Sequence, residues 1–246
     1  METLYFTKFS LEEIFNFIKK NKERKIFNFL NQHDIYNFKN NNLFRESLNT
    51  FFSINIIDGS FLTFFLSIKK FKKISRVRGP TFTRELLLKK ELSSSKKHFF
   101  IGLEKEDLKV LIEKFSHLKK VDCYNPPYIK DVVFSDEEIE KISKKINKFK
   151  PDFVWVGIAS PKQNILSYQL FKKTNAKYFF NVGAAMDFLL GKKKEAPSFV
   201  RKIGVEWFYR LITDFKYSKK KVWRSFIAVF YLLFGKIKID LKKGIL

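Results

Sequence analysis

Two successive strand-to-helix units fill residues 151–191, and they constrain the fold more than any other part of the chain. The apolar run 152–156 predicts a buried strand that ends at Gly157, and the run 176–182 predicts a second strand that ends at Gly183. Strands that alternate with helices in this way are typical of a parallel α/β sheet. Ligands of such sheets bind beyond the carboxyl ends of the strands, so we expect a ligand site beside these two glycines.

The helix after the first of these strands is predicted to begin in a short polar turn. Ser160 stands where an N-cap residue belongs, Pro161 stands at the first helical position that proline favours, and Gln163 lies in the first turn. The bare backbone amides of a helix N-terminus suit a phosphate group. A phosphate-bearing ligand is therefore the leading interpretation of this stretch.

The rest of residues 1–191 continues the alternation of strands and helices. Further strands are predicted at 25–30, 54–57, 98–103 and 121–124. Helices are predicted from the capping box at Ser10, over 34–51, 61–71, 81–92 and 105–115, and from a second capping box at Ser135. We therefore predict an α/β body at 1–191, built on a Rossmann-like parallel sheet with flanking helices.

Residues 192–246 have a different character and predict a basic, helical C-terminal appendage without a convincing strand. An apolar stripe recurs there at helical spacing, and it is preceded by Lys219, Lys220, Lys221 and Arg224; the stripe consists of Trp223, Ile227, Phe230, Tyr231 and Phe234. Such a helix suits the interface of an anionic membrane. A helix that packs on the body and happens to be basic is the alternative.

The charge of the chain favours an anionic partner. Lys and Arg number 49 against 25 Asp and Glu, a formal net charge of +24. That excess suits nucleic acid, an anionic membrane or a phosphate-rich substrate, although a solvated coat of lysines is the default for individual residues. The single Cys123 excludes an internal disulfide and a cysteine-based metal site. With no signal-peptide pattern, and with the apolar run 226–234 too short to span a bilayer, we expect a protein that is soluble or bound at a membrane surface.

Several polar residues at predicted strand ends are candidates for chemistry. Asp58 follows an apolar strand and precedes Gly59, where partial desolvation of its carboxylate suits a general base. A turn-forming Asp-Gly that caps the next helix is the alternative. Asn31 ends another strand on the same expected edge, as a ligand-binding amide or as a turn residue. Arg76 and Arg78 precede a glycine in a loop, where a solvated pair is the default.

The sequence also lacks several familiar signatures. It contains no G-x-G-x-x-G, no Walker A motif and no Asp-x-Asp of the kind that holds a divalent ion in metal-dependent sugar transferases. His33, His98 and His117 show no ligand spacing with one another or with the cysteine. We therefore expect no metal site.

Four segments together resemble the WecG/TagA/CpsF glycosyltransferase family in both order and spacing. They are Gly157 to Gln163, Asn181 to Gly191, Ala196-Pro197, and Glu206 to Leu211. In the N-terminal half, Asn31, Ile57-Asp58-Gly59 and Arg76-Val77-Arg78-Gly79 resemble further motifs of this family. The resemblance covers the chain from about Ser10 to Arg224.

This resemblance implies an inverting, metal-independent transferase. Such an enzyme moves a hexose-type sugar, N-acetylmannosamine or its uronic acid, from UDP to a polyprenyl-diphosphate-linked acceptor sugar in cell-surface polysaccharide synthesis. By analogy Asp58 is the base, and Asn31, Arg76 and Gln163 line the active site. Gly183 and Asp187, with Ser160 and Gly59, hold the nucleotide. Arg210 and Arg224 meet the lipid diphosphate at the inner face of the cell membrane.

The chain departs from the family pattern at charged positions. Glu195 stands where an arginine usually precedes the Ala-Pro pair, which reverses a charge near the expected diphosphate, and the later arginines are reduced mainly to lysines. A family member without activity that serves as a membrane-associated binding subunit is thus one alternative. A basic nucleic-acid-binding protein is another alternative, and only the net charge supports it. We expect that the protein has no nucleic-acid partner. Self-association stays open.

Overall fold

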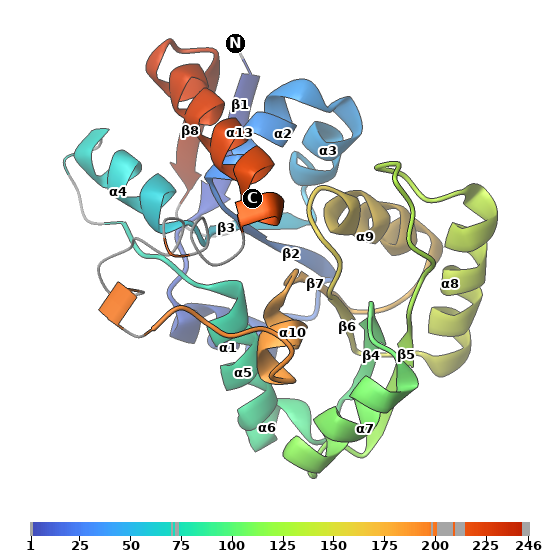
Figure 1. Cartoon of the computed structure of the whole chain (residues 1–246). Coiled ribbons are helices and arrows are strands. Elements are labelled where there is room, and N and C mark those ends of the chain that lie inside the picture. Colours follow the sequence, from blue (N-terminus) through green and yellow to red (C-terminus); the bar gives the residue numbers. More distant parts are fainter. Residues whose placement is uncertain are drawn as a thin grey trace.

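The computed structural model describes residues 2–69, 71, 74–197, 199–200, 209 and 215–242, with the side chains of 215–222 excepted. Six parallel strands form its central sheet in the order β3-β2-β7-β6-β4-β5 (Figure 1). Their bounds are β2 (Lys25–Leu30), β3 (Ser53–Ile57), β4 (Lys97–Ile101), β5 (Lys120–Tyr124), β6 (Phe153–Val156) and β7 (Tyr178–Asn181). The predicted α/β class with a Rossmann-like parallel sheet is confirmed.

Helices cover both faces of this sheet, because its strands are apolar on both sides. One face packs on α1 (Leu11–Lys20), α5 (Gly79–Leu88), α6 (Lys90–Ser93), α7 (Lys105–Lys114) and α10 (Ala185–Leu189). The other packs on α8 (Asp136–Phe149) and α9 (Lys162–Lys173). Phe82 of α5 is fully buried at the centre of the first layer, where its ring contacts those of Phe27, Trp155 and Phe180.

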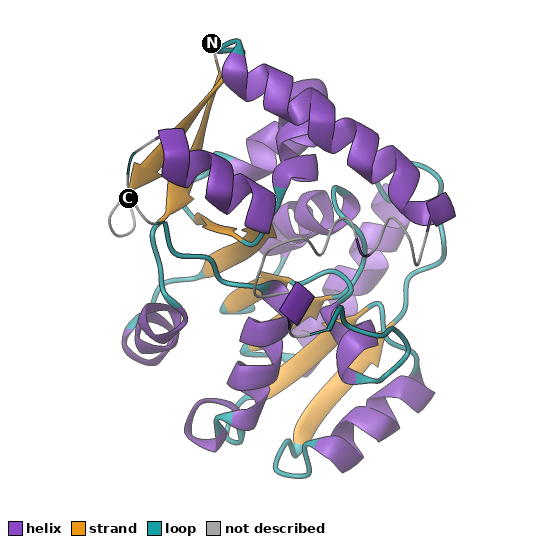
Figure 2. Ribbon diagram, turned by 60° about the vertical axis from the view of Figure 1, so that its left-hand side comes forward, coloured by secondary structure: helices purple, strands orange, loops and turns teal. Residues whose placement is uncertain are grey.

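The two ends of the chain meet in a small second sheet. β1 (Glu2–Thr7) pairs in parallel with β8 (Ile237–Lys242), in register from Glu2 with Ile237 to Thr7 with Lys242 (Figure 2). Around this pair, a third apolar cluster joins α2 (Gln32–Asn40), α3 (Asn42–Leu48), α4 (Ser60–Lys69) and α13 (Phe215–Leu233).

The expectation of a C-terminal region without a strand was therefore wrong. β8 alternates buried Ile237 and Ile239 with exposed Lys238 over only six residues, and its partner lies at the opposite end of the chain, so local pattern gave little indication of it. The boundary between a body at 1–191 and an appendage at 192–246 stays a prediction.

Three local predictions also differ from the structure. The helix expected over 34–51 is two helices, because Asn41 caps a new start by accepting a hydrogen bond from the Phe44 N–H at 2.9 Å. The helix expected over 81–92 breaks at Lys89. Ser160 is not the N-cap of α9: the helix begins at Lys162, with Pro161 in the cap position.

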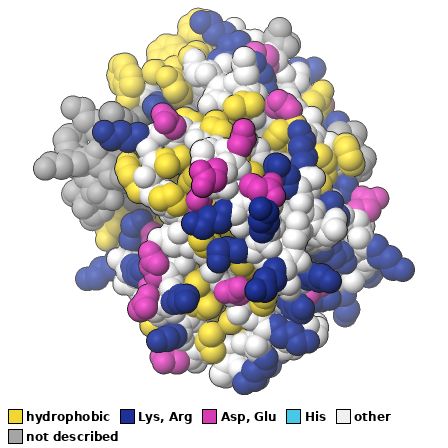
Figure 3. Space-filling view, turned by 90° about the vertical axis from the view of Figure 1, so that its right-hand side faces the viewer, with side chains coloured by type: hydrophobic (Ala, Val, Ile, Leu, Met, Phe, Trp, Pro, Cys, Tyr) yellow, Lys and Arg dark blue, Asp and Glu magenta, His cyan; other side chains and the backbone are white. Residues whose placement is uncertain are grey.

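Basic side chains on the face that carries α8 are dispersed. Figure 3 views the molecule from the right-hand side of Figure 1 and shows Lys and Arg spread over this face among acidic and apolar side chains. On this face the charge has the distribution of a solvated coat.

Candidate functional site

A cavity of about 350 Å³ opens beyond the carboxyl ends of β3, β2, β7 and β6. Its wall brings together eight of the residues that the sequence singled out: Asn31, Asp58, Gly59, Arg76, Ser160, Gln163, Gly183 and Asp187. Parallel strands end at one edge of a sheet, and each of these residues except Arg76, which lies between α4 and α5, follows a strand or lies in the first turn of the helix after it. The sheet therefore assembles the site that the sequence predicted at this edge.

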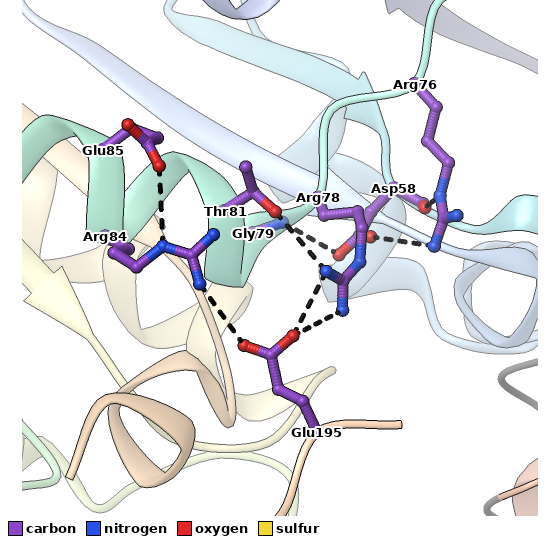
Figure 4. A network of polar contacts seen from close by, with 8 residues as sticks. All are labelled: Asp58, Arg76, Arg78, Gly79, Thr81, Arg84, Glu85 and Glu195. Atoms are coloured by element: carbon purple, nitrogen blue, oxygen red, sulfur yellow. Dashed lines mark hydrogen bonds and ion pairs between the residues drawn. The ribbon is translucent and has the colours of Figure 1, made fainter. Parts of the chain in front are cut away.

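Asp58 directly follows β3 and is fixed by two neighbours from the segment that leads into α5 (Figure 4). Its Oδ2 accepts a hydrogen bond from the Gly79 N–H at 3.2 Å, and its Oδ1 lies 4.0 Å from Nη2 of Arg76. Arg76 also donates from Nε to the Asp58 carbonyl. An amide donor at a helix start and a guanidinium both favour an ionised carboxylate, the form that a general base needs. The carboxylate is about one-quarter exposed, so a ligand can reach it.

Glu195 adds two further arginines to this polar network. Its Oε2 lies 3.3 Å from both Nη1 and Nη2 of Arg78, and its Oε1 lies 4.0 Å from Nη1 of Arg84 (Figure 4). Arg78 lines the cavity, so it is more than the solvated arginine that we took as its default. The reversed charge at position 195 is thus balanced by two cations of the same chain.

Gln163 and Gly183 line the cavity at the start of α9 and just beyond the end of β7. Gln163 is almost fully buried in the first turn of α9, and its Oε1 accepts a hydrogen bond from the Gly183 N–H at 2.9 Å. Gly183 has φ +55°, a left-handed conformation that glycine adopts without the strain of a Cβ. The Gln163 side chain therefore fixes the turn that follows β7.

Asn31 caps a helix and lines the cavity at once. Its Oδ1 accepts from the His33 N–H at 2.9 Å, and its own N–H donates to Oδ2 of Asp34 at 2.9 Å. Buried Asp34 also accepts a hydrogen bond from the hydroxyl of Ser160, which explains why that serine does not cap its own helix. The turn-residue and site-residue interpretations of Asn31 are thus compatible.

Gly59 allows two strand ends to approach closely. A Cβ at this position would lie 2.6 Å from Oε1 of Gln32 and 3.0 Å from the Cα of Asn31. A side chain at this position would displace the Gln32 side chain and would push Asn31 away by a few tenths of an ångström. The glycine therefore keeps Asp58 and Asn31 on adjacent walls of one cavity.

The predicted diphosphate-binding residues belong to the C-terminal region. Arg224 of α13 stacks over the ring of Tyr36 at 5.1 Å, and its Nη1 lies 3.5 Å from Nε2 of His33, which lines the cavity. Arg210 lies outside the described residues. Asp187 of α10 lines the cavity and forms an ion pair with Lys193.

A buried ladder of amides ties three of the strands beneath the cavity. Oδ1 of Asn28 on β2 accepts hydrogen bonds from Asn181 of β7 at 2.7 Å and Asn164 of α9 at 2.8 Å. Its Nδ2 donates to Asn55 of β3 at 3.0 Å. All four side chains are at most 2% exposed. The ladder fixes the register of β2, β3 and β7, the strands that are followed by Asn31, Asp58 and Gly183.

Sequence reasoning missed several residues of the cavity wall, among them Gln32, His33, Asp34, Ser60, Phe188 and Lys193. Asp34 carried a usable signal, since an acid three residues after an asparagine cap is the pattern of a capping box. His33 carried none, because a single histidine in a helix start is common.

The other titratable candidates lie away from the cavity. Burial lowers the pKa of His98 to about 4, and this ring accepts a hydrogen bond from the Trp155 Nε1–H at 3.1 Å in the core. Burial likewise raises the pKa of the Cys123 thiol to about 11. Within the described ranges, no group of three or more His, Cys, Asp or Glu side chains is placed to hold a metal ion. The same ranges contain no helix both long and apolar enough to cross a membrane.

A doubly covered parallel sheet with a polar cavity at its carboxyl edge defines an α/β protein of the ligand-binding type described for Rossmann-like folds. The sequence model of the glycosyl transferase WecG/TagA/CpsF family matches residues 3–243, so the chain belongs to this family.

Curated relatives from Staphylococcus aureus carry a more specific name. A protein of strain MRSA252 is 34% identical over 113 residues, and proteins of strains NCTC 8325 / PS 47 and COL are each 32% identical over the same length. Each is named N-acetylglucosaminyldiphosphoundecaprenol N-acetyl-beta-D-mannosaminyltransferase. The matches span 45% of this chain and 42% of each relative.

Proposed function

We propose that this protein transfers an N-acetylmannosamine-type sugar from a UDP-sugar to a polyprenyl-diphosphate-linked N-acetylglucosamine acceptor, in the synthesis of a cell-surface polysaccharide. The observation that carries the proposal is the placement of the Asp58 carboxylate in one cavity with Gln163 and Gly183. The family and the names of its Staphylococcus aureus relatives support the substrate class.

In the proposed reaction, Asp58 accepts the proton of the acceptor hydroxyl as the hydroxyl oxygen attacks the anomeric carbon. A new carbon–oxygen bond forms on the face opposite to the diphosphate, the bond to the diphosphate breaks, and its electron pair leaves with UDP. The configuration at the anomeric carbon is thereby inverted. The base lies beside the backbone amide of Gly79 and the guanidinium of Arg76, which hold its carboxylate in place.

The negative charge of the departing UDP must be stabilised, and we assign this role to the cations that line the cavity, Arg76, Arg78 and Lys193. Gly183, Asp187 and Ser160 would hold the nucleotide, with Gly59 leaving room for it. Arg210 and Arg224 would bind the diphosphate of the acceptor, since a guanidinium binds phosphate oxygens with two parallel donors. We propose that no metal ion takes part. The location would be the inner face of the cell membrane, with the C-terminal region against the lipid.

The most direct test is a screen of UDP-sugars against a short-chain polyprenyl-diphosphate-N-acetylglucosamine acceptor, scored by product mass. We expect a product heavier than the acceptor by one N-acetylhexosamine or N-acetylhexosaminuronic acid residue, formed in the presence of a chelator. Salt-sensitive retention of bulk nucleic acid without UDP binding would contradict the proposal. UDP binding without any product would favour a binding subunit instead.

A further inference from the structure

Helix α4 exposes an apolar face that its role in the core does not explain. Phe64 and Ile68 are four residues apart and so lie on one side of the helix, and Phe71 follows in a turn two residues beyond its end at Lys69. They are 65%, 58% and 97% exposed, respectively. Leu62 and Leu66 of the same helix are fully buried in the third apolar cluster. The helix is therefore apolar towards the core and towards solvent alike.

Helix α13 shows the same two-sided character. Its buried side, with Ala228 and Leu232, packs in that third cluster, and the helix lies against α2. Its exposed side carries large apolar residues at helical spacing, namely Trp223, Phe226, Phe230, Leu233 and, just beyond its end, Phe234. The two interpretations of the C-terminal stripe, packed or interfacial, thus apply to opposite sides of one helix.

Both helices border the cavity. Ser60 and Phe61 of α4, and Ser225, Phe226 and Val229 of α13, are part of its wall. At their far ends, Nζ of Lys69 donates to the carbonyl of Leu232 at 3.4 Å. Figure 1 shows both helices on the same side of the molecule, away from β4, β5 and α7. The apolar surface therefore begins at the cavity wall and continues outward on both helices.

The charge of the segments that contain α4 and α13 indicates what kind of partner would cover their exposed apolar residues. Residues 60–80 and 215–239 contain no Asp or Glu, although the chain has 25 of them. Lys69, Lys236 and Lys238 are exposed beside the apolar residues. Segments with large exposed aromatic side chains, whose charged residues are all Lys or Arg, match an anionic headgroup layer over hydrocarbon. A protein partner of mixed charge would not account for the absence of Asp and Glu from these two segments.

We propose that α4 is a second membrane-inserting element, which enters the same lipid surface as α13 and leaves the cavity open between the two helices. The polyprenyl chain of the acceptor would run between Phe61 and Phe226 into the bilayer. The assignment of this lipid chain rests on the proposed function; the insertion of α4 does not. The proposal gives α4, a helix of the α/β body, a role that the sequence assigned to the C-terminal region alone.

The test uses the full chain with α4 made polar at its exposed positions. The variant is Phe64→Ser/Ile68→Ser/Phe71→Ser, and its matched control is Leu88→Ser/Val110→Ser/Tyr128→Ser, which removes three exposed apolar side chains elsewhere. Co-sedimentation with vesicles of phosphatidylglycerol and phosphatidylcholine gives the partition coefficient. We expect a decrease of roughly ten-fold or more for the α4 variant and less than about two-fold for the control.

Two results would overturn the proposal. One is an α4 variant that partitions like the control. The other is an α4 variant that loses a concentration-dependent self-association while it still binds vesicles, because the face would then be an interface between copies. If the triple variant does not reach the parental unfolding temperature, Phe71→Ser alone replaces it, since this side chain is almost wholly exposed. A partition coefficient unchanged in that variant also counts against insertion.

Activity separates failure of this inference from failure of the proposed function. With a long-chain acceptor embedded in vesicles the α4 variant should turn over at least roughly ten-fold more slowly, whereas with a water-soluble short-chain acceptor it should match the parent. An equal loss of turnover with both acceptors would contradict the proposal that the polyprenyl chain runs between the two helices. A parent protein without transfer on either acceptor, but with vesicle binding that depends on α4, would reject the enzyme and keep the membrane element.

Discussion

At the scale of single residues, the position of Glu195 explains how the chain carries an acid beside the cavity that we propose binds UDP. The carboxylate lies within ion-pair distance of Arg78 and Arg84, and its side chain is largely buried. Arg78 lines the cavity, so its positive charge is partly offset before any ligand arrives. Glu195 is thus expected to weaken the binding of anionic ligands without preventing it.

Replacing Glu195 by glutamine should tighten UDP binding. The variant Glu195→Gln removes one negative charge next to Arg78, and we expect the UDP dissociation constant to fall about two- to five-fold, with a steeper dependence on salt. Isothermal titration against Glu140→Gln, which removes an ion-paired acid on α8, supplies the measurement and its control. Weaker binding in Glu195→Gln would show that the acid organises the site and does not compete with its ligand.

His98 makes the stability of the fold depend on pH. Burial lowers the pKa of its imidazole to about 4, while the unfolded chain has the ordinary value of 6.5. Between these values the unfolded state binds more protons, so the free energy of unfolding falls as the pH falls from 6.5 towards 4, by up to about 3 kcal/mol. His98→Gln should flatten this part of the profile, measured by urea unfolding. A variant with the parental slope would assign the pH dependence to other groups.

At the scale of secondary-structure elements, the amide ladder connects the core to the site. Asn31, Asp58 and Gly183 follow the ends of β2, β3 and β7, and each strand contributes one asparagine at the same level of the sheet. Buried amides are costly unless they are paired, so a shift of one strand against another would break several hydrogen bonds at once. The ladder therefore specifies the register on which the geometry of the cavity depends.

Removing the centre of the ladder should destabilise the fold strongly. Asn28→Ala leaves the amides of Asn55, Asn164 and Asn181 without this partner, and we expect a loss of about 3 kcal/mol or more in the free energy of unfolding. Asn147→Ala, which removes one exposed hydrogen bond to Lys173, should cost less than about 1 kcal/mol. If the two variants lost comparable free energy of unfolding, the ladder would stabilise the fold no more than an exposed hydrogen bond does.

The elements also show how far local sequence determines this fold. Strands such as 25–30 and the small-residue turns after them were predictable, because each has an apolar run and a turn residue within a short window. The break at Asn41 and the pairing of β8 with β1 were not, since a cap competes with a continuing helix and a short strand depends on a distant partner. Among the helical residues of the cavity, Gln163 and Asp187 were found because they belong to segments that resemble the family, whereas His33 was missed because no such segment includes it.

At the scale of the whole molecule, the C-terminal region completes the structure that carries the site. β8 pairs with β1, α13 packs on α2, and α2 begins at the cavity wall with Asn31 as its cap. Deleting this region to test membrane binding would also uncover β1 and the buried face of α2. Point substitutions on exposed residues are the better experiment, because they change the surface and leave these contacts in place.

The central claim is that one carboxylate in this cavity removes the proton of the acceptor, and Asp58→Asn tests it most directly. The amide can still accept the hydrogen bond from the Gly79 N–H, so the cavity should keep its shape. With a short-chain acceptor and the active UDP-sugar, we predict a transfer rate lower by about 10²- to 10⁴-fold, with the UDP dissociation constant within about two-fold of the parent. Turnover of Asp58→Asn at the parental rate would contradict the account.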